Sequence, residues 1–145
     1  MFELFESKKT KQVKNHLRNL VILGASDGHL QQAEKEIIVK IGLRHGLKQP
    51  AIEKIIANPG HKHLPLAKTD EDRFQQVYDI VEMTLSDGIA DETELHFCVE
   101  MAEKLGFRKS AVGLLIRKIS LSITEGTDRE TIKKEVIPFL ASQAL

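Results

Sequence analysis

Apolar residues recur along the first part of the chain at the spacing of buried helical stripes. One stripe follows the i, i+4, i+7, i+8 pattern, and a second ends at Gly46. A short third segment begins with Pro50, where a first-turn proline is tolerated. The pattern predicts three helices within 11–57. The expected buried positions of the first two are Val13, Leu17, Leu20, Val21 and Gly24, then Ala33, Ile37, Ile38, Ile41 and Leu47.

The rest of the chain is also helical in pattern. Thr69 or Asp70 is placed to cap a helix with an acidic first turn, and a further segment from Asp91 to Leu105 ends before Gly106. In a terminal helix at 128–145, Pro138 should kink the helix or end its regular part. No segment alternates like a strand, so we expect an all-α single domain of six to seven helices. The expected buried positions are Phe74, Val77, Tyr78, Val81, Leu85, Phe97, Cys98, Met101, Leu105, Val112, Leu115, Ile116, Ile119 and Ile123.

The two halves are related by an internal repeat. Residues 17–56 align without a gap on 77–116. The interpretation is two three-helix units, repeat one at about 11–57 and repeat two at about 69–124, joined by a linker at 58–68 and packed face to face about a pseudo-twofold axis. A lone unit of this size could hardly bury its stripes. The identical pairs are Val21/Val81, Ser26/Ser86, Asp27/Asp87, Gly28/Gly88, Glu34/Glu94, Val39/Val99, Gly46/Gly106, Ala51/Ala111 and Ile56/Ile116.

Each copy contains an acidic turn, Ser-Asp-Gly followed after five residues by a glutamate. A structural interpretation is that the glycine ends one helix and that Glu34 or Glu94 faces the positive end of the next helix dipole. Asp91-x-x-Glu94 also resembles a capping box. A functional interpretation is that the symmetry brings Asp27, Glu34, Asp87 and Glu94 together, where they would bind calcium or magnesium. The spacing is not that of an EF-hand, and it supplies only two ligands per copy.

These motifs carry a family resemblance. "LGASDGHLQQAEKEIIVKIGLRHGL", repeated as "TLSDGIADETELHFCVEMAEKLGF", resembles the tellurite-resistance TerB family and the related N-terminal region of membrane-anchored DnaJ-like co-chaperones. The resemblance covers roughly residues 15 to 120. It implies a helical domain without catalytic activity, a role in stress response or as an interaction module, and metal binding at Asp27, Glu34, Asp87 and Glu94. The chain lacks a His-Pro-Asp tripeptide, so the co-chaperone activity is not carried over.

Composition narrows the function classes. The net charge is +0 and Trp is absent, which disfavours nucleic-acid binding. No apolar run reaches the ~18 residues that span a bilayer. The N-terminal sequence lacks the order of a secretory signal, so we expect a cytoplasmic protein without membrane insertion.

Charge and the remaining reactive side chains add further candidates. Residues 70–103 hold eleven acids against one base, and residues 104–118 hold five bases and no acid. These charges are interpreted as solvated helix faces, or alternatively as a bipolar surface that docks a partner or a like molecule head to tail. His61 and His63 form a weak zinc candidate, and Cys98 is expected in the core. No catalytic motif is present.

The sequence thus leads to two hypotheses from different classes. The first is a non-enzymatic, TerB-like and stress-associated module that binds a protein partner through an acidic surface. The alternative is a sensor or buffer for a divalent cation, calcium or magnesium, with Asp27, Glu34, Asp87 and Glu94 as the ligands.

Overall fold

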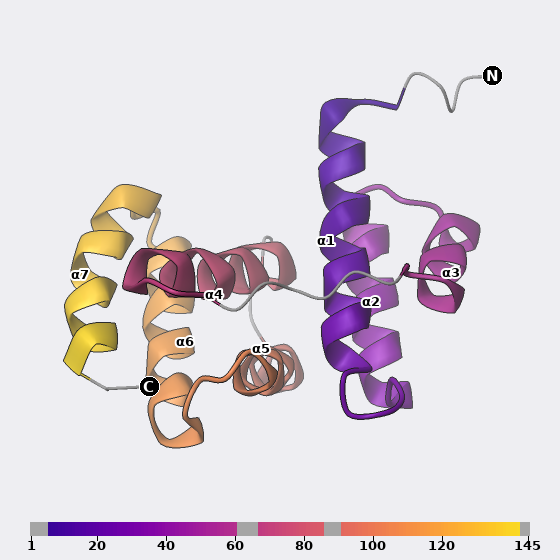
Figure 1. The fold of residues 1–145 in the computed structure, drawn as a ribbon. Helices are drawn as coiled ribbons and strands as arrows, with labels where there is room; N and C mark the ends of the chain where they lie inside the picture. Colours follow the sequence, from indigo (N-terminus) through magenta and orange to yellow (C-terminus); the bar gives the residue numbers. More distant parts are fainter. Residues whose placement is uncertain (1–5, 61–66, 86–90, 143–145) are drawn as a thin grey trace. The chain divides into compact units, whose positions relative to one another are not determined.

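The computed structural model describes residues 6–60, 67–85 and 91–142, and every regular element in these ranges is a helix (Figure 1). The all-α prediction of six to seven helices is therefore confirmed. The chain divides into two compact units, Met1–Leu64 and Pro65–Leu145, with the boundary inside the predicted linker. The helices are α1 (Lys8–Gly24), α2 (Gln32–Arg44), α3 (Gln49–Ala57), α4 (Asp70–Thr84), α5 (Glu92–Lys104), α6 (Lys109–Thr124) and α7 (Arg129–Ser142).

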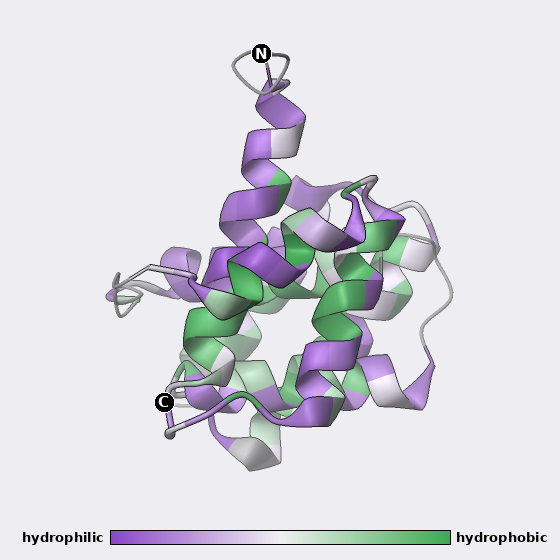
Figure 2. Cartoon of the chain, turned by 90° about the vertical axis from the view of Figure 1, so that its right-hand side faces the viewer, coloured by the Kyte–Doolittle hydropathy of each residue, from purple (hydrophilic) through white to green (hydrophobic). Residues whose placement is uncertain are grey.

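Unit 1, Met1–Leu64, contains α1, α2 and α3, and each of these helices packs against the other two. Its most deeply buried side chains are apolar and come from all three helices. The turns of α1 nearest the N-terminus are hydrophilic (Figure 2), and the buried positions of this helix begin at Val13. Pro50 lies in the first turn of α3, as predicted. The most buried side chains include Leu17, Leu20, Ile38, Ile41 and Ile52.

Unit 2, Pro65–Leu145, repeats this arrangement and adds a helix. Helices α4, α5 and α6 pack against one another, and α7 packs against α4 and α6. Thr69 caps α4, because its Oγ1 accepts a hydrogen bond of 3.0 Å from the Asp72 N–H. That helix begins with three acidic residues, as predicted, where they face the positive end of its dipole.

The helix boundaries follow the sequence repeat closely. Helix α5 begins and ends sixty residues after α2 does, and α6 begins sixty residues after α3. Gly46 and Gly106, just after α2 and α5, have φ values of 90° and 104°. In each copy the next N–H bonds back into the helix, from Leu47 to the Gly42 carbonyl at 2.9 Å and from Phe107 to the Ala102 carbonyl at 3.1 Å. Both helices therefore end in the same left-handed glycine cap.

One pair of equivalent positions differs in a compensating way. A Cβ atom added to Gly42 would lie 2.5 Å from Ile52 Cδ1 and 3.1 Å from Leu17 Cδ1. In unit 2 the residue at the Gly42 position is alanine, Ala102, and both facing residues are shorter. Val112 replaces Ile52, and Val77 replaces Leu17. Each copy thus fills the same space with a different division of volume between its helices.

Three of the expected buried positions are not buried: Leu105 and Ile123 are only partly buried, and Ala33 lies at the surface. Ala33 is exposed and Glu34 is buried, because the buried face of α2 follows the spacing 34, 37, 38, 41 and so excludes position 33. Of the two outcomes expected at Pro138, an end to the helix is not observed, because α7 continues to Ser142. The proline removes only one backbone donor, and the buried Leu140 beyond it packs the last turn onto the unit.

Candidate functional site

The first acidic turn connects α1 to α2. The N–H of Ala25 bonds to the Val21 carbonyl at 2.9 Å, and the N–H of Gly28 bonds to the Ala25 carbonyl at 3.0 Å. Gly28 has a φ of 132°, a conformation that side chains disfavour, which explains a glycine at this position. Asp27, between these residues, is exposed to solvent.

Glu34 lies at the other end of this connection, in the first turn of α2. Only 4% of the residue is exposed. Its Oε1 accepts a hydrogen bond of 3.0 Å from the Gln31 N–H, a donor that the helix itself cannot satisfy. The carboxylate also faces the positive end of the α2 dipole. The structural interpretation of Glu34 as a capping residue is therefore confirmed.

In the second copy, the capping hydrogen bond is accepted by the side chain of Asp91. The Glu94 N–H donates to Asp91 Oδ1 at 2.7 Å, which caps α5, and Glu94 is 3% exposed. This bond supplies the Asp91 half of the predicted capping box. Asp87 lies outside the described residues, so the convergence of Asp27, Glu34, Asp87 and Glu94 stays a prediction. Within 6–60, 67–85 and 91–142 there is no group of three or more His, Cys, Asp or Glu side chains that could hold a metal ion.

The other reactive candidates from the sequence are two histidines and one cysteine. His61 and His63 lie outside the described residues. Cys98 is buried, and this burial raises the pKa of its thiol to about 12, so it is a core residue as predicted and not a nucleophile. No helix in the described part of the chain is both long and apolar enough to cross a bilayer.

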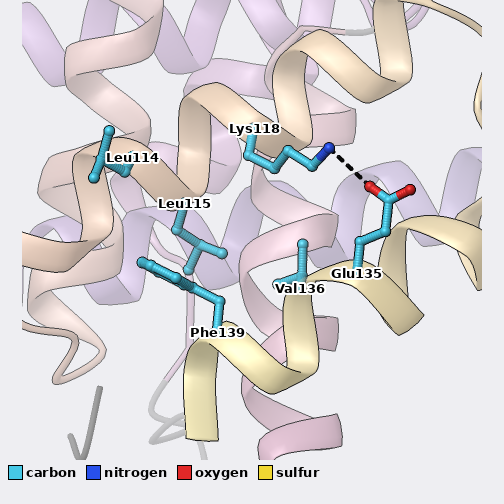
Figure 3. Close-up of a pocket in the computed structure, with 6 residues that line it drawn as sticks. All are labelled: Leu114, Leu115, Lys118, Glu135, Val136 and Phe139. Atoms are coloured by element: carbon cyan, nitrogen blue, oxygen red, sulfur yellow. Dashed lines mark ion pairs between the residues drawn. The ribbon is translucent and has the colours of Figure 1, made fainter. Parts of the chain in front are cut away.

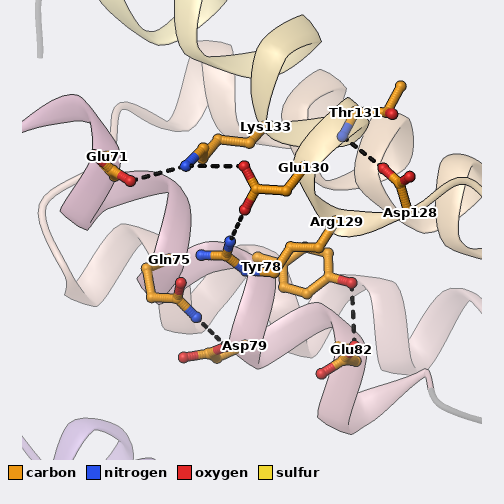
Figure 4. Close-up of polar contacts among 10 residues, drawn as sticks. All are labelled: Glu71, Gln75, Tyr78, Asp79, Glu82, Asp128, Arg129, Glu130, Thr131 and Lys133. Carbon is orange, nitrogen blue, oxygen red and sulfur yellow. Dashed lines mark hydrogen bonds and ion pairs between the residues drawn. The ribbon is translucent and has the colours of Figure 1, made fainter.

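Helix α7 neutralises part of the acidic segment that the sequence analysis singled out. The guanidinium of Arg129 lies 5.4 Å from the Phe74 ring centroid and 5.7 Å from the Tyr78 centroid, and Figure 4 shows it beside the Tyr78 ring. Lys133 Nζ lies 2.8 Å from Glu71 Oε1. The α4 face beneath α7 is thus engaged within the unit. In α1 the equivalents of Phe74 and Tyr78 are Lys14 and Arg18, so unit 1 offers no such platform for a basic helix.

Burial also shifts two titrating groups on α4. It raises the pKa of Tyr78 to about 12, and the neighbouring carboxylate of Glu82, which accepts a hydrogen bond of 3.1 Å from the hydroxyl, adds to the shift. Burial raises the pKa of Asp79, whose Oδ1 accepts a 2.6 Å hydrogen bond from Gln75 Nε2. Both groups are held in place by neighbours on their own helix, which is typical of a structural surface.

A groove between α6 and α7 is the feature that the sequence analysis missed. Its volume is about 340 Å³, within the range of ligand-binding pockets. Leu114 on its rim is 68% exposed, and Lys118 Nζ pairs with Glu135 Oε2 at 2.7 Å beside the apolar walls (Figure 3). The lining residues are Leu114, Leu115, Lys118, Glu135, Val136 and Phe139.

A comparison of the two copies contains a signal for this groove. The equivalent of Leu114 is Lys54, which is exposed on α3. The helical scaffold therefore accepts a lysine at this position, and an exposed leucine is not needed to build the unit.

No family model, curated protein or solved structure matches the chain. The resemblance to the TerB family stays a prediction from the repeated motif.

Proposed function

We propose that the chain is a non-enzymatic helical interaction module, and that the groove between α6 and α7 binds an acidic, amphipathic segment of a protein partner. The observation that supports this proposal is the combination of an apolar groove with an exposed leucine at its rim. Exposed apolar surface of this kind favours association, because covering it removes about 25 cal/mol per Å² of unfavourable hydration.

Two basic side chains of α6, Lys118 in the lining of the groove and Arg117 next to it in the sequence, are the basis for proposing an acidic partner. Arg117 and Lys118 follow Leu114 by three and four residues, so all three lie on one side of α6. Arg117 pairs with Glu92 at 3.2 Å and Lys118 pairs with Glu135 at 2.7 Å. Such exposed pairs contribute only about 0–1 kcal/mol, so an incoming carboxylate can replace or join the existing acids at little cost.

The location of this surface differs from the acidic one expected at the repeated turns. Glu34 and Glu94 are buried, so their carboxylates are not presented to a partner. The stress association and the relationship to TerB rest on the motif and remain part of the proposal. The alternative function, binding of calcium or magnesium, rests on Asp27, Glu34, Asp87 and Glu94 in the same way.

Two designed helical peptides test the proposal with the full chain. Both have leucine and phenylalanine at the same positions, and their polar positions are all glutamate in one and all lysine in the other. We expect the glutamate peptide to bind at least ~10-fold more tightly, because it complements Arg117 and Lys118. Isothermal titration calorimetry measures both affinities.

Matched variants assign the binding to the groove. Leu114→Lys introduces the residue that unit 1 has at the equivalent position, and it should abolish binding of the glutamate peptide while the chain stays folded. The control is Leu43→Lys, which removes a leucine that is 48% exposed on α2, and it should leave binding unchanged. Equal affinity for the two peptides, no binding of either, or retained binding in Leu114→Lys would each refute the proposal.

A further inference from the structure

His16 is a half-buried residue of α1 beside the buried face of this helix. It precedes the buried Leu17 by one residue and follows the buried Val13 by three. Its Nε2 atom is buried and has no hydrogen-bond partner within the described residues. A neutral imidazole tolerates such a place at a modest cost, whereas an imidazolium there would be a buried charge without an acceptor.

The surroundings of His16 oppose a positive charge. Burial lowers the pKa of His16 to about 4, and the positive charge of a protonated His45, which follows α2, lowers it further. On α3, Glu53 pairs with Lys35 of α2 at 3.9 Å, and Lys54 is exposed. On α1 itself, Arg18 bonds to Asn15 and Lys14 bonds to Glu6.

Unit 2 lacks this arrangement at the equivalent positions. The counterpart of His16 is Gln76, and the counterpart of His45 is Leu105. Neither residue takes up a proton in mild acid. The comparison separates the residues that build the three-helix scaffold, which both copies contain, from two histidines that only unit 1 contains.

We propose that unit 1 contains an acid-sensitive switch, in which protonation of His16 separates α1 from α2 and α3 while unit 2 stays folded. The direction follows from proton linkage. The unfolded unit takes up the proton as the pH falls through about 6.5, but the folded unit does so only near 4. Unit 1 is therefore at full stability above about pH 6.5 and loses stability as the pH falls toward about 4.

The carboxylates of unit 2 act outside this window or in the opposite direction. The pKa of Glu71 is lowered from 4.5 by its hydrogen bond to Lys133, and that of Asp128 is lowered from 3.8 by hydrogen bonds from Thr131. These groups destabilise the fold only in stronger acid. The raised pKa of Asp79 means that the folded state binds its proton more readily, so acid favours folding at this site. A pH near 5 therefore isolates the effect of His16.

Amide hydrogen exchange of the full chain, followed by NMR, tests the switch. Between about pH 7.5 and pH 5, we expect the protection factors of α1, α2 and α3 to fall by about 30-fold, and those of α4, α5 and α6 to stay nearly constant. His16→Gln, which introduces the residue of the second copy, should remove the loss in unit 1. The control His29→Gln changes an exposed histidine of the same unit and should retain it.

Three results would overturn the switch. These are equal losses of protection in both units, an unchanged loss in His16→Gln, and constant protection of unit 1 down to pH 5. If His16→Gln fails to fold, the wild-type chain decides the question through the ring resonances of His16. A midpoint well below 6.5 is expected, and a midpoint at 6.5 contradicts the proposal.

Discussion

Glu34 and Glu94 illustrate how one residue type at a repeated position supports two opposite interpretations. A glutamate in the first turn of a helix is both a capping group and a potential cation ligand. The sequence contains the spacing but not the burial, and burial distinguishes the two roles. Glu34 and Glu94 are only 4% and 3% exposed, and the Glu34 carboxylate accepts the Gln31 N–H, so it caps its own helix.

Gly42 leads to a prediction at the same scale. Gly42→Ala should lower the free energy of unfolding by about 1–2 kcal/mol, although alanine is the better helix former, because its Cβ would overlap the fully buried Ile52. Adding Ile52→Val recreates the pairing of Ala102 with Val112 and should recover part of the loss. Urea unfolding of the two single variants and the double variant measures the coupling. Additive effects would show that the two positions do not share a volume.

At the scale of helices, the periodicity predicted the elements well. The offset of sixty residues holds for both ends of α2 and α5, with the same glycine cap at their C-terminal ends and different residues capping their N-terminal ends. The partner of each helix face was not predictable in the same way. A stripe of apolar residues says that a face is buried but not against which helix, so the packing of α7 on α4 and α6, and the groove it forms, emerged only from the structure.

Arg129 is the residue through which the docking of α7 can be tested. Arg129→Ala should destabilise unit 2 by about 1–2 kcal/mol, because it removes the cation from the Phe74 and Tyr78 rings. Tyr78 is the only tyrosine and tryptophan is absent, so tyrosine fluorescence during urea unfolding reports on the unfolding of the surroundings of Tyr78. Lys134→Ala, an exposed position on the same helix, is the control. A midpoint equal to that of the control would mean that Arg129 does not hold α7.

At the scale of the whole molecule, the chain is two versions of one scaffold with different additions. Unit 1 has His16 with its buried Nε2 atom, and unit 2 has α7 and the groove. Duplication makes such differences informative, because the second copy shows which residues the scaffold itself requires. At the positions equivalent to Leu114 and His16, the other copy has a lysine and a glutamine, so neither side chain is required by the scaffold.

Calcium titration tests whether the carboxylates of the two acidic turns bind a divalent cation. We expect calorimetry of the full chain with millimolar calcium or magnesium to show no binding heat, because the Glu34 carboxylate caps α2 and both Glu34 and Glu94 are buried. The control combines Asp27→Asn with Asp87→Asn. Heat in the wild type that disappears in this double variant would favour the cation-binding alternative over the interaction module.

The central claim is that the α6–α7 groove binds an acidic amphipathic segment, and NMR shift mapping tests it most directly. Adding the glutamate peptide to the isotope-labelled full chain should shift the amide resonances of 114–118 and 135–139, and the Leu114→Lys variant should show no shifts. Shifts that fall instead on α1, α2 and the Asp27 turn, or that persist in Leu114→Lys, would contradict the claim.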